Sequence, residues 1–447
     1  MAVKNKKDVL AKLAKLNSSI GKKLSASEKT GFDVFKKFAG ITEYIHSGSY
    51  IVNAVISGSL LGGYPNTRSV EIAGKSGTGK TFFMLNGIKE LNEAGYFVYF
   101  IDTEGATEDS DFVNFGCDPE MMQIIRTCDT YMKVKYFVNT LISDVQKGEY
   151  DGVKIAICLD SFGMLNTDKE KADAIKGHNA ADMGLRAKEG RQLFRSITLD
   201  CSNLAIPFWF TNHTGASLDL FAPGDKPGGG EGPTFAASII LMMDKKALRV
   251  GEGDAKTQTG VILRIKSHKN RLSVPREEQT HISWATGMNK YVGLEKYIGW
   301  DNCGIVRGTI YTEDEFNKKF KKGVAVNSTG KELPSHRFER QEQDPADPKK
   351  KITAKYVCVE NPAAKTWAVK DTAYNHPGDR HIWCAEVFTE NTIKQMDEMV
   401  IKPLFKYSTI EEQLAAQSVE FDEIAEGKSE IVLIDENVIK TEENETA

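Results

Sequence analysis

Apolar residues between positions 68 and 270 come in short runs that alternate with stretches of helical spacing. A short apolar run bounded by polar or glycine-rich turns is typical of a buried β-strand. The pattern predicts strands at Val70–Ala73, Tyr96–Ile101, Ile155–Leu159, Pro207–Thr211, Ile239–Met243 and Val261–Ile265. Helices are predicted between several of them, for example at Thr81–Asn92 and Lys188–Leu199. This order predicts an α/β domain with a mostly parallel sheet covered by helices.

The two ends of the chain differ from this central part in charge. Residues 1–37 contain ten lysines against three acidic residues, and their apolar positions recur at helical spacing. They predict a short basic amphipathic helix, which is either a solvated terminal segment or an arm that docks on a neighbouring subunit. Residues 418–447 contain ten acidic residues against two lysines, which predicts an acidic tail.

The changes in pattern divide the chain into four predicted parts. A basic N-terminal helix or polymerisation arm occupies 1–45, and the α/β core occupies 46–300. A smaller C-terminal α+β domain follows at 301–417, and the acidic tail completes the chain at 418–447. Residues 324–351 are polar and rich in turn formers, so we expect an excursion or linker inside the C-terminal domain.

Composition narrows the class of protein. The 447 residues are 40% apolar and 27% charged, as in ordinary globular proteins, and the net charge is −4. This balance excludes a uniformly basic nucleic-acid coat but allows a local basic groove. We expect no signal peptide and no membrane span, since no apolar run is long enough. The seven cysteines never form a Cys-x-x-Cys, which favours reduced thiols in a cytosolic protein over disulfides or a zinc site.

The strongest chemical signal is a phosphate-binding loop. The segment GKSGTGKT matches G-x-x-x-x-G-K-[ST] and lies between a predicted strand and a predicted helix. Glycines let backbone N–H groups surround phosphate oxygens, and the helix N-terminus adds a positive dipole end. Lys80 is expected to reach the β- and γ-phosphates, and Thr81 to bind Mg²⁺. The ATP-binding residues predicted here are Gly74, Lys75, Ser76, Gly77, Thr78, Gly79, Lys80 and Thr81.

Polar residues follow three further strands of the predicted sheet. The carboxyl ends of parallel strands line one ligand crevice, so Glu104 can face the γ-phosphate and activate a water molecule. Asp160 follows four apolar residues, which predicts an acid of the Mg²⁺ shell. Asn212 and His213 end a very apolar strand, where His213 is either a γ-phosphate sensor or an ordinary structural histidine. The segment 219–233 then contains five glycines and three prolines, which is typical of a functional or mobile loop.

In their order along the chain, these motifs resemble the RecA-type recombinases, in particular the phage UvsX-like members. The resemblance covers roughly residues 45–300. It is carried by Ser47-Gly48-Ser49, GKSGTGKT, Phe100–Glu104, Leu159-Asp160-Ser161, Met183-Gly184-Leu185, Thr211–Thr214, Gly228–Pro233 and Lys269-Asn270-Arg271. It implies a RecA-like P-loop NTPase core with a twisted, mostly parallel sheet flanked by helices, plus an N-terminal helical arm and a small C-terminal domain.

The resemblance also implies roles for individual residues. Glu104 matches the catalytic glutamate, and His213 the γ-phosphate sensor. Residues 166–181 and 214–227 match the two DNA-binding loops. Gly229 and Gly230 match glycines that hold DNA phosphates, and Phe235 matches an aromatic residue at the subunit interface. Lys269 and Arg271 match cations that reach the ATP of the next subunit; on sequence alone they could equally lie in a surface turn.

Helix 188–199 carries three cations, Lys188, Arg191 and Arg195, at positions i, i+3 and i+7. This spacing places them on one face, while Leu193, Phe194 and Ile197 face inward. The resemblance makes the cationic face a DNA contact, whereas the sequence alone leaves it equally compatible with a solvated surface. The second loop departs from the bacterial pattern, because Gly215 and Ala216 replace a basic residue.

The sequence thus predicts a DNA-dependent ATPase that forms helical filaments on single-stranded DNA and exchanges strands with a homologous duplex. ATP and Mg²⁺ are the expected cofactors. Recombination mediators and single-strand-binding proteins are further partners that the resemblance implies, in the cytoplasm of a bacterium or phage-infected cell. Three alternatives remain open: a hexameric helicase with the same core, a phosphotransferase acting on a small molecule, and an ATP-gated DNA scaffold that does not hydrolyse ATP.

Overall fold

A computed structural model describes residues 40–148, 152–177, 183–216, 225–251, 256–320 and 323–408. Residues 1–39 of the predicted N-terminal arm and the whole predicted acidic tail lie outside these residues. The large sheet has the order β12-β11-β10-β9-β3-β7-β6-β4-β5, and β8 pairs with β7. Its parallel strands are β3 (Ser69–Gly74), β4 (Tyr96–Asp102), β5 (Met122–Ile125), β6 (Lys154–Asp160), β7 (Phe208–Ala216) and β9 (Ile239–Val250). The prediction of a mostly parallel α/β sheet is therefore confirmed.

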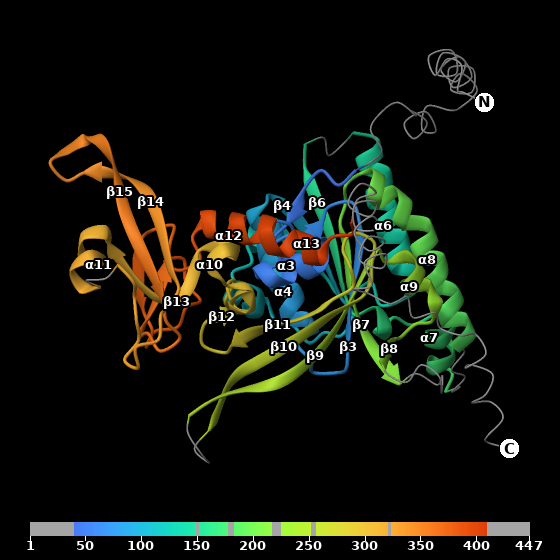
Figure 1. Cartoon of the computed structure of the whole chain (residues 1–447). Coiled ribbons are helices and arrows are strands. Elements are labelled where there is room, and N and C mark those ends of the chain that lie inside the picture. The colour runs from blue at the N-terminus through green and yellow to red at the C-terminus, as the bar shows by residue number, and fades with distance from the viewer. Residues whose placement is uncertain are drawn as a thin grey trace, which may run out of the picture. The chain divides into compact units, whose positions relative to one another are not determined.

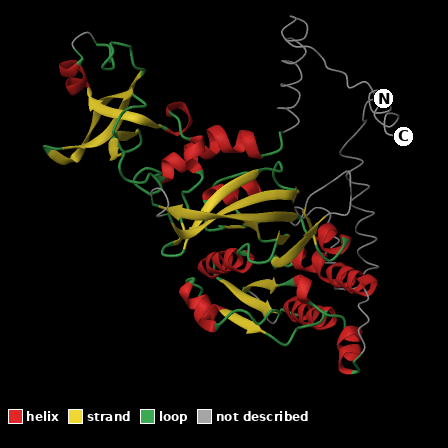
Figure 2. Cartoon of the chain, turned by 90° about the horizontal axis from the view of Figure 1, so that it is seen from below, coloured by secondary structure: helices red, strands yellow, loops and turns green. Residues whose placement is uncertain are grey.

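Helices pack on both faces of the parallel strands, as Figure 2 shows. One face packs against α3 (Tyr50–Ser57) and α4 (Lys80–Glu93), through buried side chains such as Ile56, Phe83 and Ile88. The other packs against α6 (Tyr131–Gln146) and α8 (Met183–Asn203), through side chains such as Val138 and Phe194. In Figure 1 these two helices run side by side. Both faces of the strands are thus buried, which explains their nearly continuous apolar sequences.

Shorter elements complete the core. Strand β1 (Tyr44–Ile45) pairs with β2 (Tyr64–Pro65). The helices α5 (Asp109–Asn114), α7 (Asp168–Ile175) and α9 (Glu231–Ala236) lie in connections, and β8 (Asp225–Pro227) forms a hairpin with β7. The sheet continues beyond β9 through the antiparallel strands β10 (Thr257–Asn270), β11 (Glu277–Ser283) and β12 (Gly287–Met288).

A second, antiparallel sheet has the order β14-β15-β13-β16-β17. It follows α10 (Trp300–Cys303) and comprises β13 (Ile305–Thr312), β14 (Ser335–Asp344), β15 (Asp347–Glu360), β16 (Thr366–Val369) and β17 (Tyr374–Pro377), with α11 (Glu313–Lys319) after β13. Of the excursion or linker expected over 324–351, the linker is wrong from residue 335 onward, because β14 and the start of β15 form a long hairpin. Along β14 the side chains alternate between exposed and half-buried, so the hairpin leaves no apolar signal in the sequence.

Polypeptide after the second sheet returns to the core. Helix α12 (Glu390–Met396), a short π-helical turn (Asp397–Ile401) and α13 (Lys402–Phe405) follow one another. The fully buried Asp397 accepts hydrogen bonds from Leu60 N (2.6 Å) and Ser59 Oγ (2.7 Å). Ile393, Met396, Ile401 and Phe405 belong to the same apolar cluster as α3 and α4. The predicted boundary near residue 300 stays a prediction, although a new sheet begins there.

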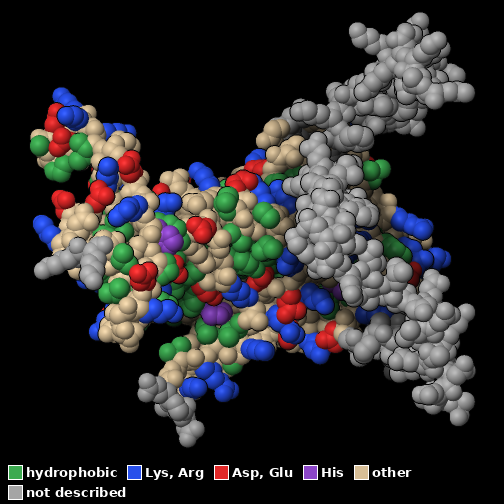
Figure 3. Space-filling view, viewed as in Figure 1, with side chains coloured by type: hydrophobic (Ala, Val, Ile, Leu, Met, Phe, Trp, Pro, Cys, Tyr) green, Lys and Arg blue, Asp and Glu red, His purple; other side chains and the backbone are tan. Residues whose placement is uncertain are grey.

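Acidic and basic side chains are interspersed over the face that Figure 3 shows. This distribution agrees with the small net charge. None of the described helices is long and apolar enough to cross a membrane.

Candidate functional site

The phosphate-binding loop connects the end of β3 to the start of α4, as the sequence predicts. Gly77 and Gly79 have φ values of 70° and 91°, a conformation that favours glycine. The buried Lys80 Nζ donates hydrogen bonds to the carbonyl oxygens of Gly74 (3.1 Å) and Lys75 (3.0 Å). Burial lowers the pKa of Lys80, and the nearby carboxylates of Asp160 and Glu104 oppose this shift. The ammonium group is thus held inside the loop.

Thr81 and Asp160 lie together at the floor of the site. Thr81 Oγ1 donates a hydrogen bond to Asp160 Oδ2 (2.6 Å), and the Thr211 hydroxyl donates to the other carboxylate oxygen. Burial raises the pKa of Asp160, an effect that these two hydrogen bonds oppose. A hydroxyl and a carboxylate next to a phosphate site fit Mg²⁺, which prefers oxygen ligands and retains water molecules. The role of Thr211 was not foreseen, since its side chain looks like part of the strand.

Glu104 and His213 meet above this floor. His213 Nε2 lies 3.3 Å from Glu104 Oε1, and Ser161 Oγ donates a hydrogen bond of 2.7 Å to the same oxygen. Both residues line a cavity of about 370 Å³ together with Lys80, Thr81 and Asp160. Glu104, Asp160 and His213, which were predicted from the ends of three strands, therefore converge on the phosphate-binding loop. A carboxylate held in this way can orient a water molecule toward a phosphate.

The same cavity has an apolar wall. Phe82, Leu85 and Phe115 line it, and the two phenylalanine rings pack edge to face with centroids 4.2 Å apart. Aromatic and aliphatic side chains of this kind suit the flat surface of a nucleobase.

Glu71 was missed by the sequence analysis. It lies fully buried in the middle of β3, where Oε1 accepts a hydrogen bond from Asn212 Nδ2 (2.7 Å). Asn212 Nδ2 also donates to the carbonyl of Gly228 (2.9 Å), whose N–H donates to the carbonyl of His213 (2.8 Å). Burial raises the pKa of Glu71 to about 7, although the Asn212 hydrogen bond and Lys269 oppose the shift. The one signal in the sequence is a charged residue inside an apolar strand.

The predicted DNA-binding residues gather around α8 and the start of α9. Lys188, Arg191 and Arg195 are all exposed, while Leu193, Phe194 and Ile197 are buried. Gly229 and Gly230 have positive φ values, and a Cβ at Gly229 would lie 2.6 Å from the Phe162 ring. At Gly230 a Cβ would lie 3.6 Å from Ala187 in α8. Gly230 therefore lies against an early turn of the helix that carries the cations, and Gly229 lies beside it against Phe162.

The two predicted DNA-binding loops are described in part. In the first, Thr167 and Glu170 cap helix α7 reciprocally, so this segment is more regular than a loop. In the second, residues 214–216 pair with 225–227 in the β7–β8 hairpin. Asp225 of this hairpin forms a 3.0 Å ion pair with Lys75 of the phosphate-binding loop.

Lys269, Arg271 and Phe235 lie at the other end of the sheet. Asn270 pairs with Ile239, the first residue of β9, and Ile239 pairs with Val70 near the start of β3. Lys269 Nζ donates to the carbonyl of Thr234 (2.6 Å). A second cavity, of about 710 Å³, contains Arg271, Phe235, Arg191 and Arg195, and none of its lining residues belongs to the first cavity. The structure thus keeps this cluster away from the phosphate-binding loop of its own chain.

Comparison with known proteins identifies the family. The sequence model of the RecA N-terminal domain family matches residues 29–289. Protein RecA of Mycoplasmopsis pulmonis is 28% identical over 270 residues, which cover 60% of this chain and 72% of that protein. Protein RecA of Thermotoga neapolitana is 28% identical over 268 residues, which cover 59% and 71%. The recombination and repair protein of Enterobacteria phage T4 is 26% identical over 232 residues, which cover 51% of this chain and 57% of that protein. With the family model matching more than half of its length, the chain belongs to the RecA family.

Proposed function

We propose that this protein is an ATP-dependent recombinase that forms helical filaments on single-stranded DNA and exchanges strands with a homologous duplex. The observation that carries the proposal is the convergence of Lys80, Thr81, Glu104, Asp160 and His213 on one cavity. Family membership and the recombination and repair protein of phage T4 support the DNA transaction. Membership of the RecA family does not favour the helicase alternative. We also propose that the protein acts in the cytoplasm of a bacterium or phage-infected cell.

Each residue of the cavity has a proposed part in ATP hydrolysis. The N–H groups of Gly74–Thr81 and the ammonium of Lys80 hold the phosphates, and Phe82, Leu85 and Phe115 hold the base. Thr81 and Asp160 would hold Mg²⁺, which neutralises phosphate charge when bound. Glu104 accepts a proton from the attacking water, and His213 detects the γ-phosphate at hydrogen-bond distance from Glu104.

Hydrogen bonds behind this cavity couple the proposed nucleotide site to the proposed DNA contacts. His213 is joined to Gly228 by a backbone hydrogen bond, and Asn212 ties Gly228 to Glu71. A shift of His213 toward the γ-phosphate would move Gly229 and Gly230, whose N–H groups are proposed to contact DNA phosphates beside Lys188. ATP binding then selects the DNA-gripping state, and hydrolysis releases it.

The hydrolysis step is tested by Glu104→Gln. This substitution keeps size and hydrogen bonding but removes the general base, so we expect turnover to fall at least about 100-fold. ATP and single-stranded DNA should still bind, and the filament should become long-lived. A matched control is Glu120→Gln, at an exposed position outside the cavity.

Steady-state ATPase rates with and without single-stranded DNA, with filament lifetimes from electron micrographs, separate the alternatives. Near-parental hydrolysis by the Glu104→Gln protein would refute the base assignment. Absence of hydrolysis by the parent protein, with ATP-dependent DNA binding retained, would favour the non-hydrolysing scaffold. DNA-independent hydrolysis accompanied by phosphate transfer to a small molecule would favour a phosphotransferase.

A further inference from the structure

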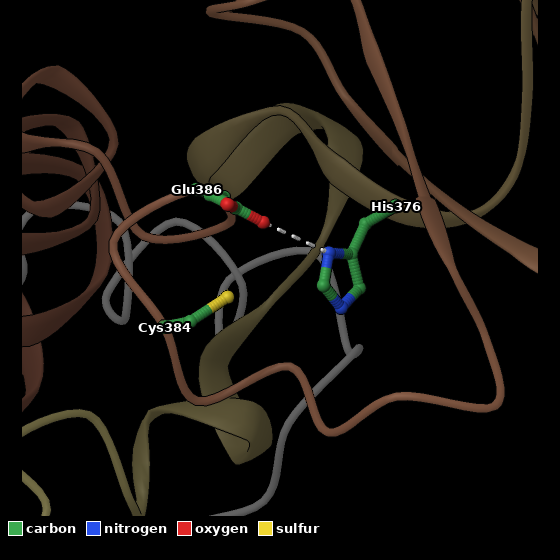
Figure 4. Close-up of side chains that lie close together, drawn as sticks. All are labelled: His376, Cys384 and Glu386. Atoms are coloured by element: carbon green, nitrogen blue, oxygen red, sulfur yellow. Dashed lines mark ion pairs between the residues drawn. The ribbon is translucent and has the colours of Figure 1, made fainter.

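Three side chains that can bind a metal ion meet beside the second sheet. His376 lies in β17, while Cys384 and Glu386 lie in the segment that leads to α12. Their ligand atoms all lie within 4.8 Å of one another. Figure 4 shows the Glu386 carboxylate and the Cys384 sulfur pointing toward the same space as the imidazole of His376. Nothing in the proposed recombinase activity uses these residues.

Hydrogen bonding prepares the His376 ring to act as a ligand. The ring is only 2% exposed, and its Nε2 lies 3.1 Å from the carbonyl oxygen of His381. A carbonyl can only accept, so Nε2 carries the proton of the neutral ring and Nδ1 presents a lone pair. This backbone contact is the arrangement that usually orients a metal-binding histidine.

The other ring nitrogen has no hydrogen-bond partner among the described residues. His376 Nδ1 is buried, and the nearest carboxylate oxygen, Glu386 Oε2, lies 3.9 Å away, which is too far for a hydrogen bond. An unpaired buried lone pair that faces a carboxylate is unfavourable. Zinc bonds to nitrogen and oxygen are each about 2 Å long, so a tetrahedral ion that bridges the two atoms needs them about 3.3 Å apart. A small rotation of the exposed Glu386 side chain closes this gap, and the bound cation then satisfies both atoms.

We propose that His376, Cys384 and Glu386 form a binding site for a zinc-class divalent cation. A nitrogen, a thiolate and a carboxylate match borderline-soft Zn²⁺, whereas Mg²⁺ and Ca²⁺ favour oxygen ligands. Glu386 is 67% exposed, so an ion can enter from solvent and keep a water molecule as its fourth ligand. On binding, the Cys384 sulfur forms a bond to the metal and its thiol proton passes to solvent.

The position of the site indicates a structural role. Trp383, next to Cys384, accepts a hydrogen bond from Asn289 Nδ2 (3.0 Å) and donates one to Glu295 Oε2 (2.9 Å). Val387 and Phe388 of the same segment are buried in the apolar cluster of the core. A metal bound here would join β17 of the second sheet to the segment that contacts the core. It would therefore hold the junction between the two sheets.

This site could not be predicted from the sequence, since a His-x₇-Cys-x-Glu spacing matches none of the usual zinc patterns. The ligands come together because β17 pairs with β16 and the following segment folds back over the strand's end.

The test uses the full chain, freed of metal with a chelator and titrated with Zn²⁺ alone or Co²⁺ alone. We expect one tightly bound equivalent, a thiolate-to-cobalt charge-transfer band, and a higher melting temperature with Zn²⁺. The variant Cys384→Ser should lose the band and the thermal shift, and Glu386→Gln should bind at least about 10-fold more weakly. Glu390→Gln, an exposed carboxylate in the first turn of α12, is the matched control and should behave like the parent protein.

Two results would overturn the proposal. One is an absent charge-transfer band in the parent protein; the other is unchanged zinc affinity in both the Cys384→Ser and Glu386→Gln variants. Binding at the nucleotide cavity would give no such band, because that cavity has no cysteine among its lining residues. The two substitutions alter partly or largely exposed side chains, so the apo variants should melt at the parental temperature.

Discussion

Glu71 connects the centre of the large sheet to both segments that are proposed to sense ATP and grip DNA. Its carboxyl is buried, one oxygen binds Asn212, and the other has no hydrogen bond among the described residues. Burial holds its pKa at about 7 instead of 4.5. The folded protein therefore binds this proton more tightly than the unfolded chain does.

This difference predicts a pH-dependent stability. The stabilisation of the folded state that comes from the protonated Glu71 carboxyl is fully present below pH 4.5 and is lost as the pH rises through about 7. Glu71→Gln keeps the Asn212 contact without the ionisation. The difference in free energy of unfolding between the Glu71→Gln protein and the parent should therefore grow by about 1–3 kcal/mol, in favour of the variant, from about pH 5 to about pH 8.

Urea unfolding at both pH values measures this gain. Glu93→Gln, at an exposed carboxylate, is the control and should show none. An equal difference between Glu71→Gln and the parent at the two pH values would mean that Glu71 ionises normally in the folded state.

Residues at strand ends could be predicted from the sequence, and Glu71 and the His376 cluster could not. Glu104, Asp160 and His213 follow apolar runs, and a parallel sheet brings such positions to one edge. The partner of a charged residue inside a strand depends on side-chain packing, which carries no periodic signal. The ligands of the His376 cluster likewise meet only through the fold of an irregular segment.

At the scale of elements, the β7–β8 hairpin connects the phosphate-binding loop to the second predicted DNA loop. Lys75 and Asp225 form its ion pair, with side chains 67% and 37% exposed. Exposed pairs contribute little on their own, about 0.2–1 kcal/mol. Their effect should therefore be seen in the coupling between ATP and DNA rather than in stability.

We predict that Lys75→Gln and Asp225→Asn each reduce the ATP-induced gain in single-stranded DNA affinity about two- to five-fold. The double variant should lose no more than either single variant, because both remove the same contact. Fluorescence anisotropy with and without ATP measures the single-stranded DNA affinity of the parent, the two single variants and the double variant. Additive losses would show that the ion pair does not transmit the signal.

The exposed cations of helix α8 lead to a separate prediction, which concerns the salt dependence of DNA affinity. If Lys188, Arg191 and Arg195 contact phosphates, each alanine variant should bind all sequences more weakly. It should also lower the slope of log affinity against log salt by about 0.7, the value for one single-strand contact. Lys355→Ala, an exposed cation in β15, is the control. If none of the three alanine variants changes the slope, this face of α8 is a solvated surface that does not contact DNA.

Sequence periodicity predicted the outward face of α8 but not its surroundings. Arg191 and Arg195 share a cavity with Arg271 because α9 packs against α8, with Gly232 close to the backbone of Arg191. The β14–β15 hairpin was missed for a related reason. None of the β14 side chains is fully buried, so burial imposed no apolar pattern on this strand.

At the scale of the whole molecule, the two ends of the large sheet have different proposed tasks. The carboxyl end holds the phosphate-binding loop, and Arg271 and Phe235 lie at the opposite end. With six residues in β3, about 20 Å of strand separates the two ends, so Arg271 cannot reach the ATP of its own chain. We propose that it completes the site of the next subunit, and that DNA activates hydrolysis by aligning subunits.

The central claim is tested by mixing two inactive proteins. Arg271→Ala should bind ATP but lose DNA-stimulated hydrolysis, and Lys80→Ala should lack a working phosphate-binding loop while keeping Arg271. In an equimolar filament, about a quarter of the interfaces pair an intact loop with an intact arginine, and each such site can hydrolyse ATP. The DNA-stimulated ATPase rate of the mixture should therefore rise toward about a quarter of the parental rate. No recovery, with both proteins shown by fluorescent labels to share the same filaments, would contradict the account.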